Sequence, residues 1–229
     1  MSDYERYGDY NEIEEDQPKS KNPVIITLKI LIAVVCIGVV GIIAFRLILF
    51  NSYPETVKNL YFNDTLTDYY NEVGDGMDIK TQDLRAPYDD PDLGNFFCDY
   101  LYVIDDIGQL QITVRYNTAS VDRIAEELGL SLDENDPTIF TYRIADNYGR
   151  IYDEVNVAAF ESQMMYRYAK LVFDGVKFDP EDGKLPEWIR LEVFVGEDSE
   201  KPYSMVPIYE NNENYAKFDE YKPSRKELP

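Results

Sequence analysis

The chain has 229 residues, of which 44 are Asp or Glu, 22 are Lys or Arg and none is His. Its formal net charge of −22 argues against nucleic acid or an anionic lipid surface as a partner. The lack of histidine removes the usual general base of enzymes and the commonest protein ligand for metals.

Residues 1–23 form an acidic tail, because seven Asp and Glu outnumber Arg6, Lys19 and Lys21. After this tail an apolar run, residues 24–50, is interrupted only by Thr27, Lys29 and Arg46. About 20 residues are enough to cross a bilayer as a helix. We therefore predict a transmembrane helix over residues 24–50 that contacts membrane lipid, with its two charges reaching the interfaces by snorkelling.

The basic residues near this run predict its orientation. Lys19, Lys21 and Lys29 lie on the amino side, whereas only Arg46 and Lys58 lie close on the other side. This bias favours a cytoplasmic N-terminus and an extracytoplasmic domain at the plasma membrane. A secretory signal has an apolar region of about 7 to 15 residues and a small-residue cleavage site. This run is longer and lacks such a site, so we expect an uncleaved signal-anchor.

The segment after the run, residues 51–91, contains prolines and glycines among many acidic residues. This composition predicts a stalk or a peripheral segment. Residues 92–209 then form one β-rich domain. Its clearest element is residues 109–116, where apolar and polar residues alternate as in a half-buried strand. The aromatic run 96–104 precedes it across a turn, which predicts an antiparallel hairpin.

A short amphipathic helix follows, because apolar residues from Val121 to Leu128 fall on one helical face. Ser120 is expected to cap its start and Gly129 to end it.

Further strands are predicted as pairs. Residues 138–145 and 150–157 form a second hairpin around the turn 146–149, and residues 166–173 pair with residues 188–195 around an acidic turn. A last strand, 205–209, precedes a polar tail, residues 210–229, whose charges and prolines predict partial disorder. This succession of short strands favours a mainly antiparallel β-sandwich, with α+β as the alternative.

Two acidic segments, 133–137 and 179–183, resemble calcium-binding loops in composition. Neither has the spacing of a complete EF-hand loop, so we interpret both as solvated turns and predict no metal or cofactor. Cys98 lies in an aromatic run, where a buried small apolar side chain is expected rather than a nucleophile. Cys36 is interpreted as a passive thiol in lipid.

Seventeen tyrosines follow the apolar run, and tyrosine supplies rigid amphipathic surface for protein or sugar contacts. Most of them lie in predicted strands and are explained by packing. Four near the polar end are candidates for a binding face: Tyr203, Tyr209, Tyr215 and Tyr221.

No nucleophile elbow, S-x-x-K or zinc motif is present in the sequence, so we do not expect an enzyme. The leading hypothesis is a single-pass surface protein whose β-rich domain binds another protein or an envelope component. One alternative is a bitopic regulatory subunit of a membrane complex, whose acidic tail with Tyr4, Tyr7 and Tyr10 meets an intracellular partner. A second alternative is a surface hydrolase that uses paired carboxylates.

Overall fold

The computed structural model describes residues 22–84, 96–129, 139–163, 165–176, 186–195, 201–210 and 218–229. The chain divides into two compact units, Met1–Asn51 and Ser52–Pro229, and each is treated separately.

The first unit contains the helix α1 (Pro23–Asn51). The side-chain oxygen of Asn22 accepts a hydrogen bond from the backbone N–H of Val24 at 3.1 Å, and Pro23 occupies the first turn, where its missing N–H costs nothing. Residues Pro23–Leu49 are long and apolar enough to span a membrane, and none of the most apolar stretch is buried in protein. The predicted apolar helix is therefore confirmed, and its length and composition are sufficient for a membrane span.

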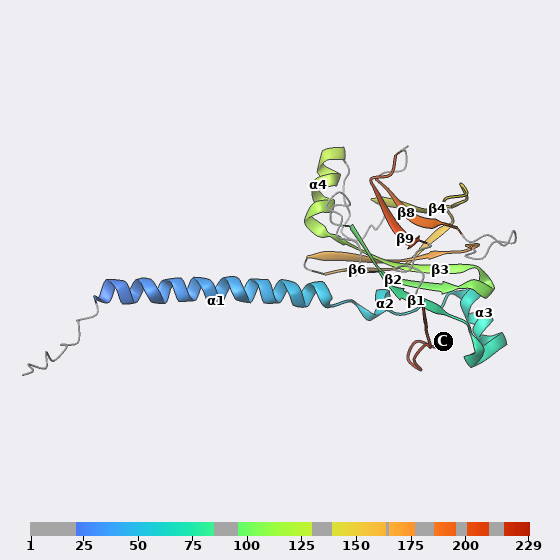
Figure 1. Ribbon diagram of the computed structural model, residues 1–229, viewed down its shortest axis with the longest axis horizontal. Helices are drawn as coiled ribbons and strands as arrows, with labels where there is room; N and C mark the ends of the chain where they lie inside the picture. Colours follow the sequence, from blue (N-terminus) through green and yellow to red (C-terminus); the bar gives the residue numbers. More distant parts are fainter. Residues whose placement is uncertain are drawn as a thin grey trace, which may run out of the picture. The chain divides into compact units, whose positions relative to one another are not determined.

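The second unit is built mainly from strands in two antiparallel sheets. The larger sheet has six strands in the order β10-β1-β2-β3-β7-β6, and the smaller has four in the order β5-β4-β8-β9 (Figure 1). The elements are α2 (Glu55–Lys58), α3 (Asp64–Val73), η1 (Gly74–Gly76), β1 (Lys80–Asp83), β2 (Phe96–Ile104), η3 (Asp105–Ile107), β3 (Gln109–Asn117), α4 (Thr118–Leu128), β4 (Phe140–Asp146), β5 (Ile151–Tyr152), β6 (Val155–Ser162), β7 (Tyr166–Phe173), β8 (Trp188–Val195), β9 (Ser204–Glu210) and β10 (Asp219–Glu220).

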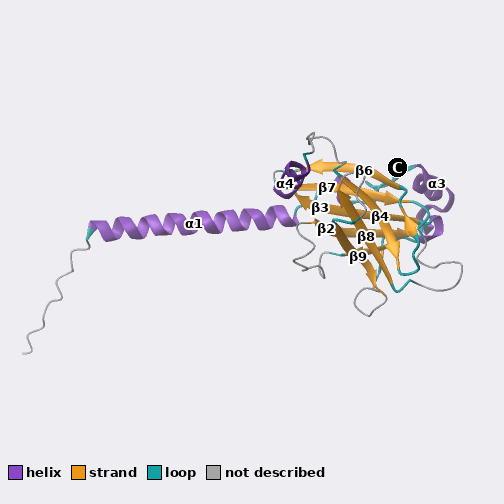
Figure 2. Cartoon of the chain, turned by 90° about the horizontal axis from the view of Figure 1, so that it is seen from above, coloured by secondary structure: helices purple, strands orange, loops and turns teal. Residues whose placement is uncertain are grey.

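The main apolar core is shared by the two sheets. Ile112 and Leu171 contribute from the larger sheet, Ile144 and Leu191 contribute from the smaller one, and all four are fully buried. The strands of the smaller sheet run obliquely to those of the larger sheet (Figure 2). Together with the helices, the two sheets are consistent with the α+β alternative. The β-sandwich that we favoured from the sequence is not confirmed.

A second, smaller core lies on the opposite face of the larger sheet. Leu60, Leu66 and Ile79 pack there against Tyr102 and Ile104 of β2. Residues 52–84, which follow the apolar run and include much of the segment predicted as a stalk or peripheral segment, thus belong to the same compact unit as the sheets. Figure 1 shows α2 and α3 on this side of the sheet. Residues 85–91 of that segment lie outside the described part of the chain.

The first predicted hairpin is confirmed, because β2 and β3 pair antiparallel along their length. The burial of β3 differs from the prediction. We expected its polar side chains to face solvent, but every residue from Gln109 to Tyr116 is buried. The alternation in the sequence is real, yet the segment that covers the polar face is too distant in sequence for the pattern to reveal it.

The second predicted hairpin is confirmed only near its turn. β4 pairs with the two-residue strand β5, and the chain then crosses to the larger sheet to form β6. The predicted pairing of residues 166–173 with 188–195 is wrong. β7 lies between β3 and β6, whereas β8 lies between β4 and β9 in the other sheet. The hairpin turn before β7 was missed because it lacks glycine and proline. There, Gln163 and Tyr166 exchange backbone hydrogen bonds of 2.8 and 3.3 Å.

The predicted helix forms as α4, but Ser120 does not cap it. The side-chain oxygen of Asn117 accepts a hydrogen bond from the N–H of Ala119 at 2.9 Å, which starts the helix earlier. Gly129 ends it as predicted, with φ of +67°, a left-handed conformation that favours glycine.

Residues 218–229 of the polar tail are described, and they pack on the larger sheet. β10 pairs with β1, and the N–H of Tyr221 donates to the carbonyl of Ile79 at 2.8 Å. The last strand before the tail forms as predicted, as β9 at the edge of the smaller sheet.

Candidate binding surface

The outer face of the smaller sheet presents the side chains that do not enter the main core. Along β4 and β8, every second residue is buried in the core, including Tyr142, Ile144, Ile189 and Leu191. The residues between them point outward by the two-residue period of a strand. We call this the β4-β8-β9 outer face, and its members are Thr141, Arg143, Ala145, Trp188, Arg190, Glu192, Phe194, Met205 and Pro207. Phe194 is buried, whereas the other members are partly or fully exposed.

Two arginines on this face stack on aromatic rings. The guanidinium of Arg190 lies 4.3 Å from the centre of the Trp188 ring, and that of Arg143 lies 4.5 Å from the centre of the Phe194 ring. Arg143 also forms an ion pair with Glu192 on the neighbouring strand. Among the described residues, none forms an ion pair or hydrogen bond with the Arg190 guanidinium. Within the described part of the chain the Arg190 donors are therefore unused, and the ring contact limits the entropy that the side chain loses on binding.

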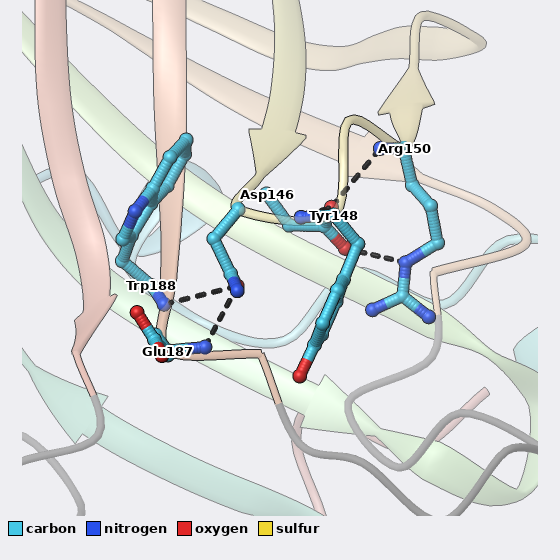
Figure 3. Close-up of polar contacts among 6 residues, drawn as sticks. Asp146, Tyr148, Arg150, Glu187 and Trp188 are labelled. Atoms are coloured by element: carbon cyan, nitrogen blue, oxygen red, sulfur yellow. Dashed lines mark hydrogen bonds and ion pairs between the residues drawn. The ribbon is translucent and has the colours of Figure 1, made fainter.

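The turn between β4 and β5 borders this face and is held by Asp146 (Figure 3). One carboxylate oxygen of Asp146 accepts hydrogen bonds from the N–H groups of Tyr148 and Arg150 at 2.9 and 3.0 Å. The other oxygen pairs with the Arg150 guanidinium. Gly149 has φ of +76°, which explains glycine at this position of the turn.

The same turn is tied to the start of β8. The side-chain oxygen of Asn147 accepts hydrogen bonds from the N–H groups of Glu187 at 2.7 Å and Trp188 at 3.5 Å. Figure 3 shows these contacts beside the Arg150 pair. The turn therefore fixes Tyr148, whose ring lies 5.1 Å from the Arg150 guanidinium, and it positions the backbone of Trp188.

Exposed apolar side chains are concentrated on this sheet and its turns. Among the described residues of the second unit, the large apolar side chains classed as exposed are Tyr148, Ile151, Tyr203, Met205 and Val73. Only Val73, at the end of α3, lies elsewhere. Tyr148 and Ile151 lie at the β4-β5 end of the sheet, and Tyr203 and Met205 lie at the start of β9.

Three of the four predicted binding tyrosines lie in the described part of the chain, and these three do not form one cluster. Tyr203 is 46% exposed, whereas Tyr209 is 5% exposed and stacks on Phe218 in the main core. Tyr221 packs on Tyr102, and its hydroxyl donates to Glu227. Burial and this hydrogen bond raise the pKa of Tyr221 well above its usual value. Tyr215 lies outside the described residues.

Sequence reasoning did not select Trp188, Arg190 or Arg143 as functional residues. A signal was nevertheless present, because Trp188, Arg190, Glu192 and Phe194 alternate with the apolar residues of their predicted strand. Large aromatic residues on the polar side of a strand, next to arginine, are unusual for a plain solvated face. That combination marks a candidate binding surface.

Cys98 and two acidic segments were also considered from the sequence as possible catalytic or metal-binding sites. Cys98 is buried in the main core, and burial, with the nearby Asp99 carboxylate, raises the pKa of its thiol well above the usual value. A thiol in such surroundings is not activated as a nucleophile. The two acidic segments resembling calcium loops, 133–137 and 179–183, lie outside the described residues. Among the described residues, no cluster of three acidic or cysteine side chains could hold a metal ion.

Comparisons with models of known protein families, with curated proteins and with solved structures found no match. Functional assignment of this chain therefore rests on its own residues and geometry.

Proposed function

We propose that this chain is a single-pass membrane protein whose α1 helix is an uncleaved anchor. Lys19, Lys21 and Lys29 on the amino side support a cytoplasmic N-terminus. The absence of a small-residue cleavage motif after the apolar run supports retention of the helix. The β-rich unit then faces the outside of the plasma membrane.

We further propose that this unit binds another protein through the β4-β8-β9 outer face. The observation that carries the proposal is the stacked pair of Arg190 and Trp188 beside the exposed Met205 on this face, since Arg190 and Glu192 of β8 lie opposite Pro207 and Met205 of β9. Exposed apolar and aromatic residues beside arginine are typical of the energetically important part of protein interfaces. The outer face of the larger sheet is an unsuitable surface, because residues 52–66 cover it.

The charge of this face indicates what the partner carries. Arg190 is partly exposed and stacked on Trp188, and its guanidinium has no ion-pair partner among the described residues. In a strongly acidic protein, such an arginine is complementary to a carboxylate on the partner. We therefore expect an acidic residue of the partner to contact Arg190.

Variants of the full-length protein test this surface by crosslinking and affinity capture from its own membrane. Arg190→Glu reverses the charge at a partly exposed position, and Met205→Glu places a charge on an apolar contact. Each is expected to lower the recovery of the crosslinked partner about tenfold, the effect of losing roughly 1.4 kcal/mol of binding free energy.

Val73→Glu is the matched control, because Val73 is also an exposed apolar residue but lies at the end of α3. It should leave recovery unchanged. Equal recovery from all three variants would contradict the proposed surface. Tyr203→Ala tests the tyrosine hypothesis more cleanly than Tyr209→Ala, since Tyr209 is buried and its loss would disturb packing.

A further inference from the structure

The outer face of the larger sheet has an unusual composition for a buried surface. Gln109, Gln111, Thr113 and Arg115 of β3 point to this face, and Lys170 of β7 lies directly opposite Thr113. Each of these five side chains is at most 1% exposed. Polar side chains are costly to bury unless hydrogen bonds replace water. The segment that covers them must therefore supply those hydrogen bonds.

Residues 52–63 supply them mostly through their main chain. Gln111 donates to the carbonyl of Tyr61 at 2.7 Å and accepts from the N–H of Tyr61 at 2.9 Å. Thr113 donates to the carbonyl of Val57, and Tyr102 donates to the carbonyl of Lys58 at 2.9 Å. We call residues 52–63 the strap. The buried side chains of Val57 and Leu60 also hold the strap. The polar contacts are replaced by water when the strap lifts, so they cost less to break than an equal apolar area.

Lys170 lies beneath the strap without a carboxylate at ion-pair distance among the described residues. Its Nζ is 3.3 Å from the Thr113 hydroxyl and 4.5 Å from the centre of the Tyr102 ring. The Thr113 hydroxyl in turn bonds the strap at Val57. The ammonium group thus has one hydrogen-bond partner and one aromatic face in place of its water shell.

The charged and titratable groups around Lys170 come from several elements. β2 contributes Tyr102, and the C-terminal segment contributes Tyr221, which packs on Tyr102, and Glu227, which Tyr221 contacts. β6 contributes Glu161, which accepts a hydrogen bond from Thr56 of the strap. The same strap carries Lys58, whose ammonium lies over the Tyr100 ring at 5.7 Å.

Compared with a lysine in water, these surroundings shift Lys170 toward its neutral form. Burial lowers the pKa of Lys170 to about 7, although attraction to Glu227 acts in the opposite direction. A lysine exposed to water has a pKa of about 10.4. An opening of the strap would let water reach Lys170 and return its pKa toward the ordinary value.

We propose that the strap is a releasable cover whose opening is coupled to the uptake of one proton by Lys170. Lower pH therefore favours the open state, in which the polar face of the larger sheet meets solvent. The coupling is independent of the β4-β8-β9 outer face, which lies on the other sheet.

The pH window follows from the two protonation states. Above about pH 10 the amine is neutral in both states, and below about pH 7 it is charged in both, so pH has no effect on opening through this group in either range. Between these limits the open state binds one more proton. The equilibrium constant for opening should then rise about tenfold for each unit by which the pH falls.

Hydrogen exchange on the full-length protein in lipid nanodiscs tests this coupling. Opening constants are obtained for amides of residues 55–63 by dividing the observed rates by the intrinsic rates at each pH. In the wild type they should fall about 50-fold from pH 7 to pH 9, because Lys170 of the closed state is already about half protonated at pH 7. In Lys170→Met they should change less than about twofold. Lys80→Met, which replaces a lysine 42% exposed on β1, should behave as the wild type.

Two results would overturn the proposal. One is a wild-type opening constant for residues 55–63 that does not depend on pH. The other is an equal opening constant for residues 55–63 and for the central amides of β3, because the strap would then open only with the whole unit. Both results come from the wild type, so the test holds even if Lys170→Met does not fold.

Discussion

Replacing Arg115 by methionine is expected to lower the free energy of unfolding of the β-rich unit by about 3–5 kcal/mol. Arg115 and Asp99 are each 1% exposed in their side chains, with 3.5 Å between the arginine Nε and a carboxylate oxygen. The rings of Tyr53, Phe97 and Tyr166 lie about the guanidinium at 5.1, 4.9 and 5.3 Å. Methionine fills much of the space but removes the Arg115 charge from beside the buried Asp99 carboxylate, and losing one member of a buried ion pair is costly.

Urea denaturation of the variant and the wild type, followed by circular dichroism, measures this loss. Arg123→Met is the matched control, because Arg123 is 68% exposed and pairs with Glu127 on the surface of α4. Surface pairs of this kind contribute little, so its change should stay within about 0.5 kcal/mol. A loss below about 1 kcal/mol for Arg115→Met would show that the buried pair does not stabilise the unit as argued.

Replacing Lys170 by methionine is expected to have the opposite effect to Arg115→Met. It should raise the free energy of unfolding of the β-rich unit at pH 7 by about 2–4 kcal/mol. Folding places Lys170 in a site that lowers its pKa to about 7, whereas the unfolded chain keeps the ordinary value. At pH 7 and below, the folded state bears the full cost of that environment. Methionine has similar length and no charge, so it removes this cost and keeps the packing.

The difference in the free energy of unfolding between Lys170→Met and the wild type should depend on pH, and this dependence tests whether the titration of Lys170 is the cause. As the pH rises from about 7 to about 10, the unfolded chain holds one more proton at Lys170 than the folded chain. The wild type therefore gains stability, and the advantage of Lys170→Met should shrink by about 1.4 kcal/mol per pH unit. Cys98 acts in the other direction above about pH 8.5 in both proteins, so it cancels in the difference. A difference that stays constant over this range would contradict the assignment to Lys170.

Local patterns predicted several elements well. The apolar run became α1, and the alternation in residues 109–116 with the aromatic run before it became the β2-β3 hairpin. The glycine at the end of α4 was also predicted. In each case the signal lies within about twenty residues, in apolar periodicity or in turn chemistry.

Long-range pairing could not be predicted in the same way. The sequence alone does not distinguish β8 as a partner of β7 from β8 as a partner of β4, since both pairings bury the same alternating residues. The covering of β3 by the strap depends on hydrogen bonds between residues about 50 positions apart, such as Gln111 and Tyr61. A polar stripe along a strand predicts exposure unless that partner is known.

The candidate binding surface was only partly visible in the sequence. Tyr203 was selected because it lies near the polar end, and it is exposed. Tyr209 was selected for the same reason, but it is buried. It still belongs to β9 and packs in the main core, because the polar segment begins only after that strand. Trp188 and Arg190 alternate with the apolar residues of their strand, but their stacking becomes evident only from the geometry.

The orientation of the β-rich unit is the claim on which the proposed function depends, and labelling of a single introduced cysteine tests it most directly. Asp153 is exposed after β5, whereas Cys98 is buried and Cys36 lies in the predicted span, so Asp153→Cys should react above a low background. A membrane-impermeant maleimide is expected to label it in intact cells, on a protein of full-length mass in the membrane fraction. Ser2→Cys, in the acidic tail, should react only after permeabilisation. Labelling of Asp153→Cys only in permeabilised cells, or its release into the medium without residues 24–50, would contradict a permanently anchored extracytoplasmic domain.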